Sequence, residues 1–314
     1  MQNTSDEKGV LVIAQGAERY IQMAFTIAMS VRLSNPGLSI ALVTDSKNKE
    51  LENYFDYIIP IDPKFGVGFS QKIHALDYTP FQRTMLIDVD CMVIRNIDFL
   101  WEKFNGKPVS VIGRKMMSGS TIGTTVEKMK ETLGVPYLLV FNGGVYYFER
   151  SEIAKKVFEE AQHVFTILYD KLGLVKFNGR PGDEPAMSIA MSANFVEPID
   201  DNKQGMYTPI GQKGKFEMDA LSGHCTFYKE GEKVSPAIMH FGGGYPEAFH
   251  YRRESRKVKW AYHSRLPHTF ISFTVNALYN PAYILHVFLY RVLKLAFRGK
   301  RSSLLPLMPM FRFE

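Results

Sequence analysis

The sequence has too few cysteines for a disulfide framework, because its 314 residues include only Cys91 and Cys225. Both are expected to be reduced packing residues, which is the usual state of cysteine in the cytosol. The opening residues, MQNTSDEKG, are polar and lack the basic-then-apolar pattern of a secretion signal. The sequence therefore favours a cytoplasmic protein.

Both common phosphate-binding loops are also missing, since the chain has neither a G-x-G-x-x-G motif nor a Walker-type lysine loop. The apolar pattern nevertheless predicts strands at 10–14, 38–43 and 57–61, and helices at 18–33, 70–78 and 152–172, with the polar region 116–134 as a surface excursion. Strands and helices that alternate with short connections are typical of βαβ units in a parallel sheet. A diphosphate held at the strand ends of such a sheet would then need a metal ion.

Hydrophobic residues make up 46% of the chain, which is ample for a packed core. The net charge of +6 and the pI of about 9.1 attract anions such as nucleotides, anionic lipid headgroups or nucleic acid. The positive charge is concentrated after His240 and in the C-terminal tail, without basic strands interleaved with aromatic residues. This distribution argues against nucleic acid as a partner.

The segment Asp88-Val89-Asp90 follows the apolar residues Met85 to Ile87 and precedes a second apolar run. Two carboxylates beside a core repel each other unless a cation lies between them. Mn²⁺ and Mg²⁺ suit this position because they bind carboxylate oxygens together with substrate phosphates. In open α/β sheets ligands bind at the carboxyl ends of strands. The pair therefore predicts a metal or phosphate site, with a structural or N-cap role as the alternative.

Two later segments carry further candidates. Asn142 precedes the adjacent glycines Gly143 and Gly144 where a strand is predicted to begin. The glycines either form an ordinary turn or let another group approach the backbone closely. Asp183 and Glu184 begin a predicted helix, where acidic residues often act only as caps.

A short predicted strand ends at His240 and is followed by Phe241 and three glycines. An imidazole in this position is a candidate third metal ligand, although packing is the commoner role of a single histidine. A predicted helix follows that carries Arg252, Arg253, Arg256, Lys257 and Lys259. These cations either form a solvated face or reach a phosphate group.

The C-terminal tail has a different composition, because no Lys, Arg, Asp or Glu occurs from Leu266 to Tyr290. After Pro281, the basic residues Arg291 and Lys294 follow at helical spacing on one face of an apolar helix. A basic amphipathic helix is typical of binding to an anionic membrane surface. Packing against the domain or a second subunit in a homodimer, and a true membrane span, are the alternatives.

Four segments occur in an order that resembles the motif set of the GT-A fold glycosyltransferases, in particular the retaining family that includes glycogenin and the bacterial lipopolysaccharide galactosyltransferases. They are Asp88-Val89-Asp90, Asn142-Gly143-Gly144-Val145, Asp183-Glu184 and His240-Phe241-Gly242-Gly243. The resemblance implies an α/β fold with a mixed, mostly parallel central sheet flanked by helices, over residues 1–265. Residues 266–314 would form the aromatic and basic membrane-associating segment.

The resemblance also implies ligands and roles for individual residues. The metal would be Mn²⁺, or Mg²⁺, held by Asp88, Asp90 and His240 on the diphosphate of a sugar nucleotide, which would be a UDP-sugar. The donor-binding residues would be Ala14, Gln15, Asp45, Lys72, Asp88, Val89 and Gly243. The catalytic residues would be Asp183, Glu184 and Asn142.

Two departures from the family pattern affect these implications. A Lys-Pro-Trp segment commonly follows the His-Phe-x-Gly motif and its lysine clamps the diphosphate, whereas this chain has Tyr245-Pro246-Glu247. The clamp is then absent or supplied by Arg252, Arg253 or Lys257. The family often has Asp-Gln where this chain has Asp-Glu, which affects the stereochemistry more than the fold.

The sequence therefore predicts a metal-dependent glycosyltransferase that moves a sugar, with retention, from a nucleoside diphosphate sugar to a glycan or lipid-linked acceptor. The expected location is cytoplasmic, with peripheral contact to the inner face of a membrane. Two other readings stay open. One is a sugar-nucleotide nucleotidyltransferase, and the other is a non-catalytic membrane-binding module.

Overall fold

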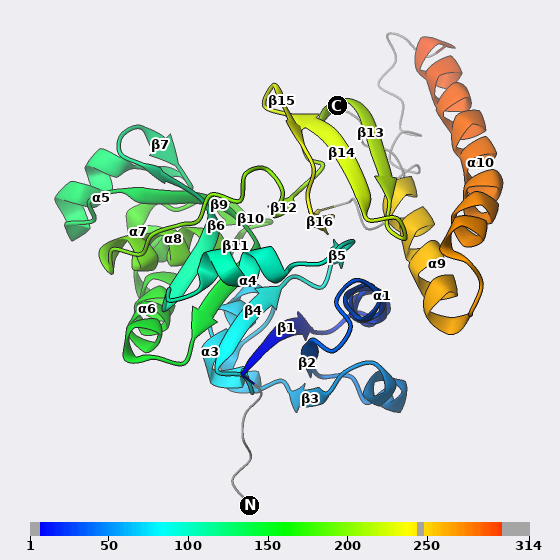
Figure 1. Ribbon diagram of the computed structural model, residues 1–314. Helices are drawn as coiled ribbons and strands as arrows, with labels where there is room; N and C mark the ends of the chain where they lie inside the picture. Colours follow the sequence, from blue (N-terminus) through cyan, green and yellow to red (C-terminus); the bar gives the residue numbers. More distant parts are fainter. Residues whose placement is uncertain (1–6, 244–247, 297–314) are drawn as a thin grey trace, which may run out of the picture.

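The computed structural model describes residues 7–243 and 248–296, which surround a six-stranded central sheet (Figure 1). The strand order is β3-β2-β1-β4-β9-β6. Their bounds are β1 (Lys8–Ala14), β2 (Ser39–Thr44), β3 (Tyr57–Pro60), β4 (Arg83–Ile87), β6 (Val109–Met116) and β9 (Leu138–Glu149). The strands β3, β2, β1 and β4 pair in parallel, whereas β9 runs antiparallel to both β4 and β6. The predicted mixed, mostly parallel sheet is confirmed.

Helices cover both faces of this sheet. They are α1 (Glu18–Ser34), α3 (Ala75–Tyr78), α4 (Asp98–Phe104), α6 (Glu152–His163) and α8 (Asp183–Ala193). Alternate strand residues point to opposite faces, so Val10 and Val12 pack in one core with α1 and α4, while Leu11 packs in a second core with α3, α6 and α8. Burial on both faces requires strands that are apolar almost throughout. The sheet is therefore open to ligands only at its strand ends.

Two smaller sheets lie beside the first. One has the order β12 (Met206–Tyr207), β16 (Ile238–His240), β5 (Cys91–Val93), and β16 pairs antiparallel with β5. The other is a meander of β13 (Lys213–Asp219), β14 (His224–Lys229) and β15 (Glu232–Val234). Two short hairpins complete the strands, namely β7 (Ser120–Thr121) with β8 (Thr124–Thr125) and β10 (Lys176–Phe177) with β11 (Arg180–Pro181). The pairing of β16 with β5 brings the segment near residue 240 beside the segment that follows Asp90.

Two of three predicted elements need correction. The helix predicted at 70–78 consists of α2 (Phe69–Lys72) and α3, because the chain turns at Ile73 and His74. The region 116–134, predicted as a surface excursion, contains α5 (Val126–Leu133), whose Val126 and Met129 are buried in a small apolar cluster. The segment predicted as a helix at 152–172 is helical throughout, as α6, a π-helical turn at Val164–Leu168 and α7 (Tyr169–Leu172). In α5, two apolar residues one helical turn apart pack into the cluster, while the rest of the helix is exposed.

The helices α9 (Phe249–His263) and α10 (His268–Ala296) lie side by side, on the opposite side of the molecule from α5 and α6 (Figure 1). Ile271 and Val275 of α10 are buried against Ala261 of α9. Packing against the domain, one of the predicted alternatives, is thus present for the first part of α10. The predicted domain boundary at residue 265 stays a prediction.

Several other apolar side chains of α10 are exposed. Phe273 and Ile284 lie on the face opposite Ile271, whereas Leu278 and Leu285 lie on the same face as Ile271, farther along the helix. The side chains of the predicted basic face, from Arg291 onward, lie outside the described residues. In the described part of the chain, no helix combines the length and apolar character that crossing a membrane requires.

A buried ionic cluster joins β13, α9 and α10. The Lys257 side chain is fully buried, and its Nζ lies 2.8 Å from Asp219 and 3.0 Å from Glu254. Arg253 Nε lies 2.7 Å from Glu254, and Ser272 of α10 donates to Asp219 at 3.0 Å. Two acids and two bases therefore compensate one another inside the protein, as buried charges require.

The buried cluster predicts a large loss of stability for Lys257→Met. This change leaves the carboxylates of Asp219 and Glu254 without their shared cation, and removing one partner of a buried pair costs about 3–5 kcal/mol. We expect a matching decrease in the free energy of unfolding, measured by urea denaturation. The control is Lys259→Met on the same helix, where the side chain is exposed and the change should be within about 0.5 kcal/mol. Equal effects of the two changes would contradict the assignment.

Candidate functional site

The parallel strands β1, β2 and β4 end at the same edge of the sheet, where Gln15, Asp45 and Asp88 follow them directly. The backbone N–H of Gly16 donates to both carboxylate oxygens of Asp45, at 3.0 and 3.1 Å. This contact joins the ends of β1 and β2. The structure thus places predicted donor-binding residues at one strand-end edge, which is where ligands bind in open α/β sheets.

Gln15 connects this edge to the loop before α2. Its Oε1 accepts a hydrogen bond from the backbone of Gly68 at 2.9 Å, and its Nε2 donates to the carbonyl of Gly66 at 3.4 Å. Ala14, also predicted to bind the donor, is the buried last residue of β1.

A hollow of about 460 Å³ opens at the end of β3 and is lined by residues 60–65, Asp77 and Tyr78. None of these lining residues belongs to the carboxylate cluster described next.

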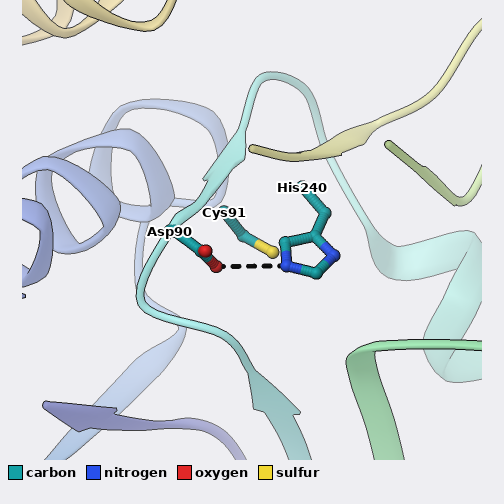
Figure 2. Close-up of side chains that lie close together, drawn as sticks. All are labelled: Asp90, Cys91 and His240. Atoms are coloured by element: carbon teal, nitrogen blue, oxygen red, sulfur yellow. Dashed lines mark ion pairs between the residues drawn. The ribbon is translucent and has the colours of Figure 1, made fainter. Parts of the chain in front are cut away.

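The predicted metal ligands come together from distant parts of the chain. His240 Nε2 lies 3.2 Å from Asp90 Oδ1 and 3.6 Å from Asp88 Oδ2, and Figure 2 shows the imidazole facing Asp90. Each of the three side chains is between 11% and 21% exposed. The site is therefore mostly enclosed but open to an ion from one side.

Asn142 determines which nitrogen of His240 carries a proton. Asn142 Oδ1 accepts from the backbone N–H of Gly144 at 3.0 Å and lies 2.5 Å from His240 Nδ1. Because this oxygen is an acceptor, Nδ1 must donate to it. In the neutral imidazole the Nε2 lone pair then points at the two carboxylates, which is the orientation of a metal ligand. The predicted catalytic residue Asn142 thus has a positioning role for His240.

Lys72 lies between the aspartate pair and the acidic residues of α8. Its Nζ is 2.9 Å from Asp88 Oδ1 and 2.8 Å from Asp183 Oδ2, and it donates to the carbonyl of Gly143 at 2.9 Å. Burial alone would lower the pKa of Lys72, but the charges of Asp183 and Asp88 outweigh it and raise the pKa well above its ordinary value. Lys72 therefore stays charged and joins the two acidic groups.

The adjacent glycines lie inside β9, so they form no turn. A Cβ on Gly143 would lie 2.8 Å from Glu184 Cγ, and one on Gly144 would lie 2.7 Å from His240 Nδ1. The Gly143 N–H donates to Glu184 Oε1 at 2.6 Å. The close-approach alternative is thus the correct one: site side chains pack directly on this backbone, which leaves no room for a side chain at either glycine.

Two residues of the site were missed by sequence reasoning. Tyr146 is buried, and its hydroxyl donates to Asp183 Oδ2 at 2.6 Å. Cys91 is buried beside Asp90 and His240, and its Sγ lies 3.7 Å from the carbonyl of Gly144. Both occur in apolar runs that predict packing. For Cys91 the available signal was its position directly after Asp90. Tyr146, in the apolar part of β9, gave no signal until its hydroxyl partner was known.

Negative charge exceeds positive charge at this site. The carboxylates of Asp88, Asp90, Asp183 and Glu184 lie around one permanent cation, Lys72. Burial raises the pKa of Asp88 and of Glu184 above their ordinary values, and for Glu184 the charge of Asp183 adds to the effect. Clustered carboxylates that are costly to ionise are stabilised by an added cation.

The histidine responds to the same excess of negative charge. Burial would lower the pKa of His240, but the hydrogen bond to Asp90 and the charges of both aspartates outweigh burial and raise it. For Asp90 that hydrogen bond outweighs burial and lowers the pKa. Carboxylate oxygens and an imidazole nitrogen, here with His240 Nε2 3.2 Å from Asp90 and 3.6 Å from Asp88, are donors of the kind that Mn²⁺ accepts. The residues present therefore fit a divalent metal ion.

Several predicted site residues are not shown to take part in the cluster of Asp88, Asp90 and His240. Arg253 and Lys257 belong to the buried ionic cluster of α9, so these two candidates for the diphosphate clamp are engaged elsewhere. Val89 is buried between the two aspartates, and Gly243 ends the described segment in a left-handed conformation with φ +70°. Their donor-binding roles stay predictions. Residues 245–247, the departure from Lys-Pro-Trp, lie outside the described residues.

No protein-family model matches the sequence, and no curated protein sequence matches it. Several solved structures are similar. An active-site mutant of LgtC in which a Gln is replaced by Glu matches with a TM-score of 0.51 at 12% identity, covering 84% of this chain and 99% of LgtC. The glycosyltransferase GlyE of Streptococcus pneumoniae TIGR4 matches at 14% identity and a TM-score of 0.44, over 63% of this chain and 47% of GlyE.

Mouse xyloside xylosyltransferase 1 matches at 16% identity and a TM-score of 0.44, over 64% of this chain and 87% of the enzyme. This chain therefore matches about half of the length of GlyE. The match to LgtC extends over nearly the whole LgtC chain, and at 12% identity it shows that the two proteins share a fold.

The close contact at Gly144 predicts a specific loss of metal binding for Gly144→Ala. The new Cβ would lie 2.7 Å from His240 Nδ1, so the imidazole must leave the position in which Nε2 faces the aspartates. We expect Mn²⁺ affinity to fall about 10- to 100-fold, as when a metal ligand loses its orientation, measured by titration calorimetry. In the His240→Ala background the same change should have little further effect. A full additional loss there would show that Gly144→Ala acts through something other than His240.

Proposed function

We propose that this chain, whose fold is that of the GT-A glycosyltransferases, is a metal-dependent glycosyltransferase that uses a nucleoside diphosphate sugar as donor. The observation that carries the proposal is the convergence of Asp88, Asp90 and His240, with His240 Nε2 within 3.6 Å of both carboxylates. The imidazole is held by Asn142 in the orientation of a metal ligand. A metal site at the strand ends of this fold supports diphosphate binding, because Mn²⁺ and Mg²⁺ are commonly shared between carboxylates and phosphates.

The proposed metal ligands are Asp88, Asp90 and His240, and the metal is Mn²⁺ or Mg²⁺. When bound, the ion supplies Lewis-acid stabilisation of the charge that develops on the departing diphosphate. The proposed donor is a UDP-sugar, with the base and ribose near Ala14, Gln15 and Asp45. The contacts of Gln15 with the loop at 66–68, and of Asp45 with Gly16, support this placement because they join the strand ends into one surface.

The acidic residues of α8 have different environments. Asp183 is fixed by Lys72 at 2.8 Å and by the Tyr146 hydroxyl at 2.6 Å, so it is oriented and its charge is compensated. Glu184 accepts one hydrogen bond, from Gly143, and burial raises its pKa. A carboxylate with raised proton affinity is suited to accept the proton of the acceptor hydroxyl. We therefore assign Glu184 that role, and Asp183 the electrostatic stabilisation of the cation-like sugar.

The proposed acceptor is a glycan or a lipid-linked sugar, and retention of configuration is carried over from the resemblance to the retaining family. Two half-exposed rings support a sugar acceptor. Phe69, one turn before Lys72 in α2, and Phe177 have ring centroids 5.9 Å apart. Phe177 lies directly on the backbone of Gly182, which precedes Asp183. Aromatic rings present an apolar face on which the C–H face of a pyranose can stack.

The metal proposal predicts that Asp90→Asn abolishes transfer. The substitution keeps the shape of the side chain and removes one charge from the proposed metal site, so we expect donor hydrolysis and transfer to fall at least about 100-fold. The measurement is release of nucleoside diphosphate from a panel of sugar nucleotides with Mn²⁺. The control is Asp98→Asn, an exposed aspartate paired with Lys8 on the surface, which should retain full activity. Undiminished turnover of the unmodified chain in EDTA would overturn the proposal.

We also propose that α10 contacts an anionic membrane surface. Its outer face carries exposed apolar side chains, with Phe273 74% and Ile284 67% exposed, and the sequence after it is basic, with Arg298, Lys300 and Arg301. Interfacial binding combines buried apolar area with attraction to anionic lipids. A membrane surface would place the active site beside a lipid-linked acceptor.

The membrane proposal predicts that Phe273→Ser combined with Ile284→Ser weakens binding to vesicles containing phosphatidylglycerol. Burial of each side chain contributes about 1.5–3 kcal/mol when it is complete, so a decrease of about 10-fold or more is expected in co-sedimentation. The matched control is Ile153→Ser, because the Ile153 side chain is 51% exposed. It belongs to α6, a helix on the other side of the molecule from α10. Equal binding of all variants would exclude α10 as the contact.

A further inference from the structure

The site holds a second possible ligand set that includes Cys91. Cys91 of β5 is directly opposite His240 of β16 in the antiparallel pair. Directly opposite residues project from the same face of a sheet, with Cβ atoms about 4.5–5.5 Å apart. Asp90 precedes Cys91, and its carbonyl accepts from Phe241, the residue after His240, at 3.0 Å. The backbone therefore fixes these three side chains next to one another.

The donor atoms of this second set are close enough to share one ion. One ligand atom each from Asp90, Cys91 and His240 lies within 4.8 Å of the others. Figure 2 shows the sulfur of Cys91 beside the imidazole ring, on the side that faces Asp90. Sγ lies 3.7 Å from the carbonyl of Gly144, and a thiol is a weak hydrogen-bond donor. This contact is therefore weak compared with a sulfur–metal bond.

The two ligand sets favour different metals. Carboxylate oxygens suit the hard ions Mg²⁺ and Mn²⁺, so Asp88 with Asp90 and His240 forms the hard set. A thiolate, an imidazole and a carboxylate are the ligands that Zn²⁺ takes, in a tetrahedral arrangement that leaves the fourth position for another group. Cys91 with Asp90 and His240 forms this soft set. Because Asp90 and His240 belong to both, one ion excludes the other.

We propose that the site binds Zn²⁺ through Asp90, Cys91 and His240, and that this binding competes with Mn²⁺. On binding, the S–H bond of Cys91 breaks, a sulfur–zinc bond forms, and the proton goes to solvent. No electron is transferred in this step. Inhibition of sugar transfer by zinc is a consequence that rests on the proposed function, whereas zinc binding itself does not.

The test uses Co²⁺ as a spectroscopic substitute for Zn²⁺ on the full chain. A cobalt–thiolate bond gives a strong charge-transfer absorption in the near ultraviolet, which oxygen and nitrogen ligands do not give. The unmodified chain should show this absorption, and Zn²⁺ should remove it. The Cys91→Ser variant should lack it. The matched control is Cys225→Ser, the other buried cysteine, on β14, which should keep it.

Metal affinities give a second, independent measurement. We expect Cys91→Ser to lower Zn²⁺ affinity about 10-fold or more and to leave Mn²⁺ affinity within about twofold, because serine keeps the hard set intact. Either Co²⁺ binding without thiolate absorption or unchanged Zn²⁺ affinity in Cys91→Ser would overturn the inference. If Cys91→Ser does not fold, the spectrum of Cys225→Ser decides, because Cys91 is then the one cysteine left in the sequence.

The inference and the proposed function fail in different ways. Thiolate absorption without Mn²⁺-dependent turnover of any sugar nucleotide would support the zinc site and contradict the proposed transfer reaction. Mn²⁺-dependent turnover without thiolate absorption would support the transfer reaction and contradict the zinc site. A chain that binds neither Co²⁺ nor Zn²⁺ would overturn the inference directly.

Discussion

The antiparallel pairing of β5 with β16 is the constraint on which the site depends. It sets Cys91 opposite His240, and the hydrogen bond from Phe241 to the carbonyl of Asp90 extends the contact to the aspartate pair. A shift of the register by one residue would turn His240 to the opposite face of the small sheet. A ligand set contributed by residues far apart in the sequence is thus fixed by backbone hydrogen bonds, which leaves little freedom to lose when an ion binds.

The antiparallel strand β9 supports the rest of the site. Gly144 accepts from the backbone of Asp88 at 3.0 Å, and Gly143 contacts Lys72 through its carbonyl and Glu184 through its N–H. Because these two residues lack side chains, the aspartate pair, α2 and α8 can all approach the same stretch of backbone. The polar groups are thereby held by a strand that is paired on both sides, and rigid elements position a functional site more precisely than loops do.

The predicted site residues that the structure brings together are those at the ends of regular elements. Asp88, Asp183 and His240 each follow or begin an element whose apolar pattern is strong, so position alone indicated a site. Tyr146 could not be found in this way, because a tyrosine in an apolar strand is indistinguishable from core until its hydroxyl partner is known. Arg253 and Lys257 were misjudged for the converse reason. Asp219, which pairs with Lys257, and Met218, whose carbonyl accepts from Arg253, lie far away in sequence. A basic helix predicts a solvated face unless such partners are known.

The position of Arg253 and Lys257 affects how a diphosphate would be neutralised. Both are enclosed with Glu254 and Asp219, so neither is available to replace the lysine that the family carries after its histidine motif. Among the described residues, Lys72 is the cation that contacts the site carboxylates, and Asp88 and Asp183 already compensate its charge. A bound diphosphate would add negative charge to a site that has an excess of it. Under the proposed function, most of the compensation would then come from a divalent ion, with Arg252 as the clamp candidate that stays outside the buried ionic cluster.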